Sequence, residues 1–390
     1  MVIPPFEFRA NPALAFGSGR IWDLPGMLAR HGKRIGIVRG RASLKASGTW
    51  DGLASALREA GLEAVRAEVV GEPTPEAVDA IAEHFRQGAV ACVAAIGGGS
   101  VLDAGKAVSA MMLQEGSVEE YLEGVGGRPL DGRKVPFIAV PTTAGTGSEA
   151  AKNAVISRVG EQGFKRSLRH DALMPDAVLI DPELHRSCPP DLTAACGLDA
   201  LTQLLESYVS TKATPLTDAL AEAGLAAVGK SLMPAWRNGD DAEARGWMAY
   251  AAYLSGVTLT NAGLGVVHGF ASSVGGRFSI PHGILCGTLL ESSTRRTIER
   301  LKEKGDVRAL AKYARAGRHL TGREGRDLGA DLDALLNLLA EWTRGLKIPR
   351  LGAYGIRAKD VEDLAAYTGC KNNPISLSPR DLEEILRERL

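Results

Sequence analysis

The sequence predicts two domains of different architecture, an α/β domain over residues 1–186 and an all-helical domain over residues 187–390. Short apolar segments alternate with helical patterns in the first half, a rhythm typical of an open, mostly parallel sheet covered by helices. After Pro189-Pro190 the strand patterns almost vanish, and long helical patterns take over. A chain of 390 residues is long enough for two domains of this size.

The strands expected in the first half are short apolar segments, and each is followed by a glycine-containing loop or by a helix. Thr74 is placed to cap a helix that begins at Pro75, where proline is favoured. Ala89–Ile96 is a continuous apolar run, as in parallel strands that are buried on both faces. The expected strands are Arg34–Arg39, Glu63–Val70, Ala89–Ile96, Pro136–Val140 and Ala177–Ile180, and the expected helices cover residues 52–60, 75–87 and 101–113.

The second half is expected to consist of helices, and no internal repeat is evident. The expected helices are Asp191–Ser210, Thr217–Met233, Ala242–Thr260, Ile298–Arg315, Asp331–Arg344 and Leu382–Leu390.

Composition excludes several classes of protein. The 46 basic residues balance the 46 acidic ones, which argues against a nucleic-acid binder with a strong basic field. No apolar stretch reaches the ~20 residues of a membrane span, and the chain does not open on a secretory signal. The cysteines are scattered and lack C-x-x-C spacing, so neither a disulfide framework nor a cysteine-based zinc site is implied, and we expect a cytoplasmic protein. They are Cys92, Cys188, Cys196, Cys286 and Cys370.

Two glycine-rich loops are candidates for binding phosphate. Gly97-Gly98-Gly99-Ser100 follows the buried strand Ala89–Ile96 and precedes a helix, whose free N–H groups would point at a bound pyrophosphate. The segment PTTAGTGSEA at residues 141–150 follows another buried strand and supplies hydroxyls and glycines. Each loop alone could be a tight turn without a ligand, but two of them in one sheet favour ligand binding.

Asp199, His268 and His282 are candidate metal ligands. The two histidines are followed by glycine and lie among small residues, and Asp199 lies in an apolar helix where a carboxylate is costly to bury without a cation. Taken singly, each could be a satisfied core residue or a helix-terminal one. Together they indicate a site for Zn²⁺ or Fe²⁺.

Four segments, GGGSVLDAGKA, PTTAGTGSEA, LDALTQLLESYVS and VVHGF…SIPHG, resemble in order and separation the motifs of the iron-containing (group III) alcohol dehydrogenases. DPEL at Asp181–Leu184 and Asn372-Asn373-Pro374 add to the resemblance, which covers nearly the whole chain. It implies the dehydroquinate synthase-like fold: an N-terminal dinucleotide-binding α/β domain and an all-α C-terminal domain, with the active site in the cleft between them.

The resemblance also implies roles for individual residues. The family's metal site is one Asp and three His, of which Asp199, His268 and His282 match three and would be catalytic. Its cofactor-binding positions fall on Gly97, Gly98, Gly99, Ser100, Asp103, Thr142, Thr143, Thr146, Asn153 and Lys165.

Three positions depart from the family's pattern. Gln203 stands at the position of the fourth ligand, one helical turn after Asp199 and on the same helix face. Its amide oxygen is a weaker ligand than the imidazole that it replaces. Zinc would then fit as well as iron, as in related glycerol dehydrogenases. Ser272 stands where the family often has a proton-relaying His, which puts that relay in question. Gly40 stands where an Asp usually holds the ribose 2′-OH of NAD.

The third departure bears on the choice of cofactor. Without a carboxylate at Gly40, a 2′-phosphate meets no repulsion, and Arg39 and Arg41 are available to pair with it. We therefore expect NADP(H) rather than NAD(H) as the cofactor. The alternative is that both arginines are merely solvated loop charges.

These residues predict an NAD(P)-dependent oxidoreductase that transfers a hydride between nicotinamide and a small alcohol or aldehyde, with a divalent metal polarising the carbonyl oxygen. The alternatives are a maleylacetate reductase-like enzyme, a dehydroquinate synthase-like lyase, and a cofactor-binding protein with a degenerate metal site. The family resemblance implies a homodimer, with which the apolar opening VIPPFEF is compatible.

Overall fold

The computed structural model describes residues 5–9, 12–41, 44, 48–160, 163–325 and 327–390. The chain forms two compact units. The α/β unit comprises Ala10–Arg158 and Lys165–Cys188, and the helical unit comprises Pro189–Leu390 together with the segments 1–9 and 159–164. Residues 1–4 of the apolar opening that we linked to dimer formation lie outside the described residues.

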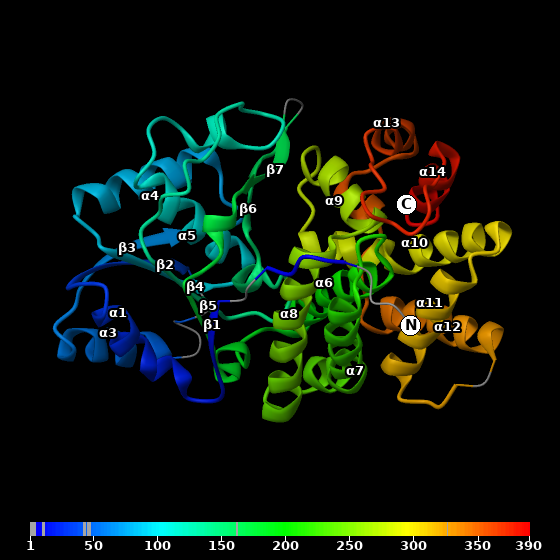
Figure 1. Ribbon diagram of the computed structural model, residues 1–390, viewed down its shortest axis with the longest axis horizontal. Helices are drawn as coiled ribbons and strands as arrows, with labels where there is room; N and C mark the ends of the chain where they lie inside the picture. The colour runs from blue at the N-terminus through cyan, green and yellow to red at the C-terminus, as the bar shows by residue number, and fades with distance from the viewer. Residues whose placement is uncertain (1–4, 10–11, 42–43, 45–47, 161–162, 326) are drawn as a thin grey trace. The chain divides into compact units, whose positions relative to one another are not determined.

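The α/β unit is built on a six-stranded parallel sheet in the order β1-β8-β5-β4-β2-β3. The helices α1 and α3 lie on one side of this sheet and α4 and α5 on the other (Figure 1). The strands are β1 (Ala13–Phe16), β2 (Arg34–Gly40), β3 (Glu63–Val69), β4 (Cys92–Gly97), β5 (Phe137–Pro141) and β8 (Ala177–Ile180). The α-helices are α1 (Leu24–Ala29), α3 (Thr49–Glu59), α4 (Pro75–Gln87) and α5 (Gly99–Met111). The 3₁₀ helices are η1 (Arg20–Asp23), η2 (Val118–Tyr121), η3 (Ser148–Ala150), η4 (Asp171–Leu173) and η5 (Pro182–His185).

The central strands are buried as their apolar runs predict. Every residue of β4 and of β5 is buried, because helices cover both faces of the sheet. Thr74 caps α4 as expected, since its hydroxyl accepts the N–H of Ala77 at 3.3 Å.

The strand order creates a switch point between β2 and β4. The chain leaves β2 toward β3 on one side, and leaves β4 toward β5 on the other. The two strands are paired in register, with Arg39 opposite Ile96, so their carboxyl ends open side by side. Ligands of open α/β sheets bind at such a point.

Three strands were not expected from the sequence. The edge strand β1 has only four residues, and β6 (Asn153–Arg158) and β7 (Phe164–Arg169) form a separate two-stranded sheet. Polar and charged residues interrupt β6 and β7, so neither segment shows the apolar run of a buried strand.

The helical unit packs around α6, whose residues are almost all buried and which contacts α7, α8 and α10. The α-helices are α6 (Pro190–Val209), α7 (Pro215–Arg237), α8 (Ala242–Ala262), α9 (Val266–Gly275), α10 (His282–Lys304), α11 (Val307–Thr321), α12 (Leu328–Gly345), α13 (Val361–Ala366) and α14 (Pro379–Arg387). The 3₁₀ helices are η6 (Leu351–Tyr354) and η7 (Ala358–Asp360). No helix among the described residues has the length and apolar character needed to cross a membrane.

The prediction of one helix over Ile298–Arg315 was wrong. The helix α10 ends at Lys304, because Gly305 adopts the left-handed conformation with φ of 72°. Asp306 then caps α11 by accepting the N–H of Ala309 at 3.0 Å. A glycine C-cap followed by an aspartate N-cap therefore separates two helices where the apolar pattern runs on.

Candidate functional site

The first glycine loop joins β4 to α5 in a tight turn. A Cβ on Gly97 would lie 2.6 Å from side-chain atoms of Val101, and one on Gly99 would lie 2.6 Å from the side chain of Thr146. Both glycines are therefore required for close packing. No side chain caps α5 at Gly98. The Val101 N–H donates to the Gly98 carbonyl oxygen at 2.9 Å, so the N–H groups of Gly99 and Ser100 are the ones that can face an anion.

The second loop follows β5 and packs against the first. Thr142 donates its N–H to the carbonyl oxygen of Gly97 at 2.9 Å, and Thr143 is the nearest neighbour of a Cβ placed on Gly98. The hydroxyl of Thr142 is buried and has no hydrogen-bond partner in the described part of the chain. A buried hydroxyl without a partner is costly, so this atom fits a site that a ligand completes.

A buried network beneath the loops holds the second loop in place. The Asp103 carboxylate accepts the Ser148 hydroxyl at 2.5 Å and the Val155 N–H at 3.0 Å. Lys106, which is fully buried, donates to three backbone carbonyls, those of Ser148, Ala151 and Asn153. Asp103 thus bonds to the protein through both oxygens and supports the loop, and sequence reasoning missed Lys106.

The burial of this network raises the pKa of Glu149, which is 2% exposed, to about 7. Loss of water around a carboxyl group disfavours its charged form, and the nearby Lys106 only partly offsets this. Burial is also the main cause of the raised pKa of Asp103 and of the lowered pKa of Lys106.

The predicted cofactor contact Lys165 forms an ion pair with Glu72. Its side chain is 9% exposed, and Glu72 also accepts the Ser157 hydroxyl at 2.7 Å. Asn153, a further predicted contact, begins β6.

The end of β2 carries the residues that we expect to determine whether NAD or NADP is bound. Gly40 is the last residue of β2, and Arg41 is exposed beyond it. Arg39 is not a solvated loop charge, because it is buried, donates to Glu68 at 2.6 Å and stacks 4.2 Å from the ring centroid of Trp50. Its Nε and Nη1 are buried without acceptors among the described residues.

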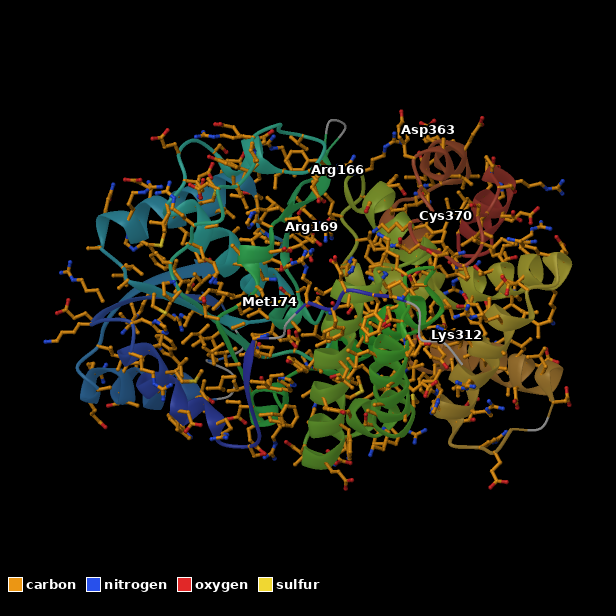
Figure 2. The ribbon with its side chains drawn as sticks, viewed as in Figure 1. Arg166, Arg169, Met174, Lys312, Asp363 and Cys370 are labelled. Atoms are coloured by element: carbon orange, nitrogen blue, oxygen red, sulfur yellow. The ribbon has the colours of Figure 1, made fainter. Side chains whose placement is uncertain are left out.

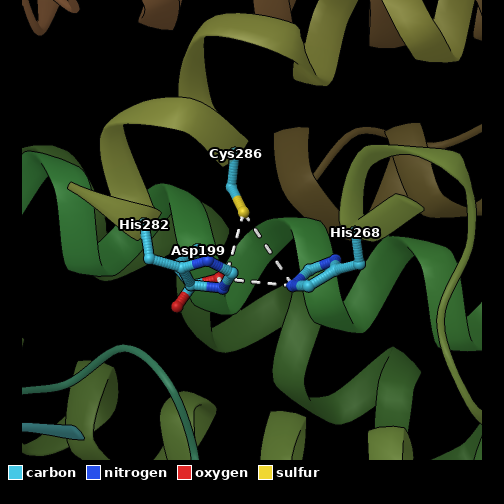
Figure 3. Close-up of side chains that lie close together, drawn as sticks. All are labelled: Asp199, His268, His282 and Cys286. Carbon is cyan, nitrogen blue, oxygen red and sulfur yellow. Dashed lines mark hydrogen bonds and ion pairs between the residues drawn. The ribbon is translucent and has the colours of Figure 1, made fainter. Parts of the chain in front are cut away.

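The candidate metal centre lies in the helical unit. Asp199 of α6, His268 of α9, and His282 and Cys286 of α10 each point one ligand atom at a common region, with all four atoms within 4.8 Å of one another (Figure 3). Gly283 and Gly269 follow the two histidines, and a Cβ on either would lie within 2.4 Å of a backbone carbonyl oxygen of another segment. These glycines let the ligand-bearing helices pack closely.

The distances between donor atoms suit a small tetrahedral ion. The Asp199 Oδ1 atom lies 3.6 Å from His268 Nε2 and 3.5 Å from His282 Nε2. The Cys286 Sγ atom lies 3.9 Å from His268 Nε2 and 3.8 Å from His282 Nε2. Around zinc, with bonds of about 2.0–2.3 Å, donors lie about 3.3–3.8 Å apart. The residues therefore fit a divalent metal.

Glu206 orients one of these histidines. Its Oε2 lies 2.7 Å from His268 Nδ1, and its Oε1 accepts the Val267 N–H at 2.7 Å. A metal-binding imidazole almost always bonds through its other nitrogen to such a partner. This contact leaves His268 Nε2 facing the cluster. Sequence reasoning missed Glu206, although its spacing of seven residues from Asp199 places both on one helix face.

Gln203 is not placed as a ligand. Its amide nitrogen donates to Asp199 Oδ1 at 3.1 Å, and its amide oxygen accepts the Ser255 hydroxyl at 2.7 Å. In this structure Gln203 therefore holds Asp199, and the fourth side chain of the candidate cluster is Cys286. Cys286 was not expected among the candidate ligands, because the scattered cysteines imply no cysteine-based zinc site. Its signal in the sequence is the i, i+4 spacing of His282 and Cys286.

The electrostatics of the cluster suit a cation. Burial opposes the charged form of Asp199, but His282 and His268 outweigh it, so the pKa of Asp199 lies below its usual value. Burial also opposes the charged form of His268, yet Cys286, Asp199 and Glu206 hold its pKa well above the usual value. Burial raises the pKa of Cys286 to about 11. The groups around His268 thus favour a positive charge at this place.

Ser272, at the position of the family's relay histidine, donates its hydroxyl to the His268 carbonyl oxygen at 3.4 Å. This bond turns the hydroxyl back onto its own helix.

Comparison with known proteins identifies the family. The fold and the donor set are those of a nucleotide-binding α/β unit joined to a helical metal-binding unit. The family model "Iron-containing alcohol dehydrogenase" matches residues 11–182, and the model of the C-terminal part of the Fe-containing alcohol dehydrogenase family matches residues 193–390. The chain belongs to the iron-containing alcohol dehydrogenase family.

Relatives and solved structures agree with this assignment. The chain is 31% identical to the NAD-dependent methanol dehydrogenase of Bacillus methanolicus, over 98% of this chain and 100% of that protein. It is 39% identical to long-chain-alcohol dehydrogenase 1 of Geobacillus thermodenitrificans, over 67% of each chain. A crystal structure of 1,3-propanediol oxidoreductase matches with a TM-score of 0.88 at 28% identity, over 99% of this chain and 100% of that one.

Proposed function

We propose that this chain is a metal-dependent alcohol dehydrogenase that reversibly transfers a hydride between NAD(P)(H) and a small alcohol or aldehyde. The observation that carries the proposal is the cluster of Asp199, His268 and His282, of which the first two are buried, in a chain of this family. A divalent metal, when bound, polarises the carbonyl oxygen of the substrate, and the nicotinamide supplies the redox chemistry.

We assign dinucleotide binding to the domain 1–186, and metal and substrate binding to the domain 187–390. The N–H groups of the first turn of α5 and the Thr142 hydroxyl would hold the pyrophosphate of the cofactor. Asp199, His268 and His282 would hold the metal, with Glu206 and Gln203 fixing the orientation of the ligands. Gly97 and Gly99 allow the cofactor loops to pack closely.

NADP(H) is the proposed cofactor of choice. No carboxylate stands at Gly40, and Arg41 is exposed immediately after it. The Glu68 carboxylate on the neighbouring strand is paired with Arg39, which reduces its repulsion toward a 2′-phosphate. Two N–H donors of Arg39 lack acceptors among the described residues, and a phosphate oxygen would satisfy them.

The proposed state is a cytoplasmic homodimer. No disulfide links the described cysteines, in keeping with a reducing compartment. The strand β1 forms one edge of the sheet and exposes Leu14 and Phe16, with the exposed Trp22 following it in the chain. An edge strand with apolar side chains can pair with a second copy.

The function is tested by loading the purified chain with Fe²⁺ or Zn²⁺ and following the oxidation of NADPH and of NADH with a panel of short aldehydes. The expected result is turnover that requires metal, with a higher kcat/KM for NADPH. Absence of turnover with every aldehyde and both cofactors would count against an alcohol dehydrogenase. Turnover of an unsaturated acid by metal-free protein would favour the maleylacetate reductase-like alternative.

A further inference from the structure

The Cys286 side chain supplies the only sulfur atom of the candidate metal cluster of Asp199, His268, His282 and Cys286. It is completely buried on α10, one turn after His282. Its sulfur lies 3.9 Å from His268 Nε2 and 3.8 Å from His282 Nε2, the two nitrogens that face the proposed metal (Figure 3).

Gln203 does not compete for this place. Its amide oxygen is bound to the Ser255 hydroxyl, and its amide nitrogen, which cannot ligate a metal, faces Asp199. The fourth donor atom near the metal is therefore a sulfur from α10 rather than an oxygen from α6.

The packing of α10 on α6 brings this sulfur to Asp199. A Cβ on Gly283 would lie 2.4 Å from the Ala195 carbonyl oxygen, and one on Gly287 would lie 2.8 Å from the Leu198 side chain. Both glycines lie on α10 and allow its axis to approach α6 closely. The face that carries His282 and Cys286 is thereby held against the turn of α6 that carries Asp199.

A thiolate changes the charge and the softness of the donor set. A thiolate and the Asp199 carboxylate together balance the charge of a divalent ion. Sulfur is a soft donor that suits Zn²⁺, whereas carboxylate and imidazole alone discriminate less between Zn²⁺ and Fe²⁺. The cysteine ligates as the thiolate and releases its proton when the metal binds.

We propose that Cys286 is the fourth protein ligand of the metal centre, and that its thiolate makes this site select Zn²⁺ over Fe²⁺. The inference deepens the proposed function and rests on it, because that function requires a metal at this site. It concerns only the identity of one ligand and the choice of metal.

X-ray absorption at the zinc edge tests the ligand directly in the unmodified zinc-loaded protein. The expected spectrum contains one sulfur at about 2.3 Å beside nitrogen and oxygen donors at about 2.0–2.2 Å. A shell of nitrogen and oxygen alone would overturn the inference, and so would a failure of the protein to retain zinc. If the protein shows no sulfur in the coordination shell of its zinc but still reduces aldehydes with NADPH, the proposed function stands while this inference fails.

Cobalt substitution compares variants without relying on activity. Co²⁺-loaded wild-type protein should show a sulfur-to-cobalt charge-transfer band in the near ultraviolet, and Cys286→Ser should lose it. The matched control is Cys370→Ser, which replaces a half-buried cysteine between α13 and α14 (Figure 2) that is not a member of the cluster. The control should keep the band. A band retained by Cys286→Ser, or lost by the control, would contradict the inference.

Competition between metals tests the claim of selectivity. Loss of a residue that hydrogen-bonds to a metal ligand typically weakens metal binding by roughly 10- to 100-fold. Cys286→Ser removes a ligand itself, so it should weaken zinc binding by more than this. It should weaken Fe²⁺ binding less. Equal losses for both metals would overturn the claim that the thiolate sets the choice. Circular dichroism of the metal-free variants verifies that the helical unit remains folded.

Discussion

Glu206 Oε2 lies 2.7 Å from Nδ1 of His268, and both side chains are buried. This contact fixes which ring nitrogen faces the metal, because the proton on Nδ1 is held by the carboxylate. Glu206 also accepts the N–H of Val267 near the start of α9. One carboxylate on α6 thus aligns both the helix and the ring that would bind the metal.

The first prediction follows from this pair. Glu206→Gln should lower the affinity for Zn²⁺ by about 10- to 100-fold, because an amide supports the imidazole less well than a carboxylate. Titration with zinc against a competing chelator measures it. Asp218→Asn, which removes a carboxylate that pairs with Lys312 on α11 (Figure 2), should leave the affinity unchanged. Equal zinc affinities of Glu206→Gln and wild type would show that this contact is only structural.

Thr142→Val should weaken cofactor binding without lowering stability. The Thr142 hydroxyl is buried without a partner among the described residues. Its removal should leave stability unchanged or slightly raised, while the dissociation constant of NADPH rises, since about 0.5–1.5 kcal/mol of hydrogen bonding is lost. Thr343→Val, whose hydroxyl donates to Leu339, should instead lower stability and leave cofactor binding intact. Fluorescence titration and thermal unfolding measure the two quantities. Unchanged NADPH binding by Thr142→Val would remove this hydroxyl from the site.

Gly99→Ala should separate the two cofactor loops. The new methyl would lie 2.6 Å from the Thr146 side chain, and such overpacking costs about 1–3 kcal/mol. Both cofactor affinity and thermal stability should fall. Gly246→Ala is the matched control, because a Cβ there meets nothing within 4 Å on the helix α8. The control should be neutral or stabilising by about 0.4–1 kcal/mol. If Gly99→Ala bound NADPH as tightly as wild type, the loops would not form one site.

The raised pKa of Glu149 predicts a pH dependence of stability. Burial raises this pKa from 4.5 in the unfolded chain to about 7 in the native state. Between these values the native state binds more protons than the unfolded state, so stability falls as pH rises through this window and stays lower above it. Glu149→Gln removes this loss of stability. At pH 8 its free energy of unfolding should exceed that of wild type by at most about 3 kcal/mol.

The measurement is the free energy of unfolding of both proteins from pH 4 to pH 8. The difference should grow with pH and vanish near the lower end. A difference that is independent of pH would show that Glu149 does not keep its proton in the native state.

The parts of the site that the sequence predicts are those whose chemistry is local. The glycines after β4 and the threonines after β5 fulfil their roles within a few residues of chain, and Asp199, His268 and His282 stand out as polar residues in apolar surroundings. The same holds for the fold, because β4 and β5 are continuous apolar runs.

The parts that the sequence does not predict depend on packing between distant elements. The i, i+4 spacing of His282 and Cys286 places both on one face of α10, but Cys286 comes near Asp199 because α10 packs closely on α6. Gln203 turns its oxygen away because Ser255 of α8 binds it. Lys106 looks like a helix-surface lysine until the second loop folds over it. Arg39 is expected at the cofactor, but its pairing with Glu68 and its stacking on Trp50, which leave only Nε and Nη1 without acceptors among the described residues, depend on the neighbouring strand and helix.

The most direct test of the proposed function is a metal titration of turnover. The chelator-treated protein is titrated with Zn²⁺ while NADPH oxidation by a short aldehyde is followed, in parallel with Asp199→Asn. We expect turnover to rise linearly and to saturate at one metal ion per chain, with no rise in the variant. Full turnover by metal-free protein, or an identical titration curve for Asp199→Asn, would contradict the account.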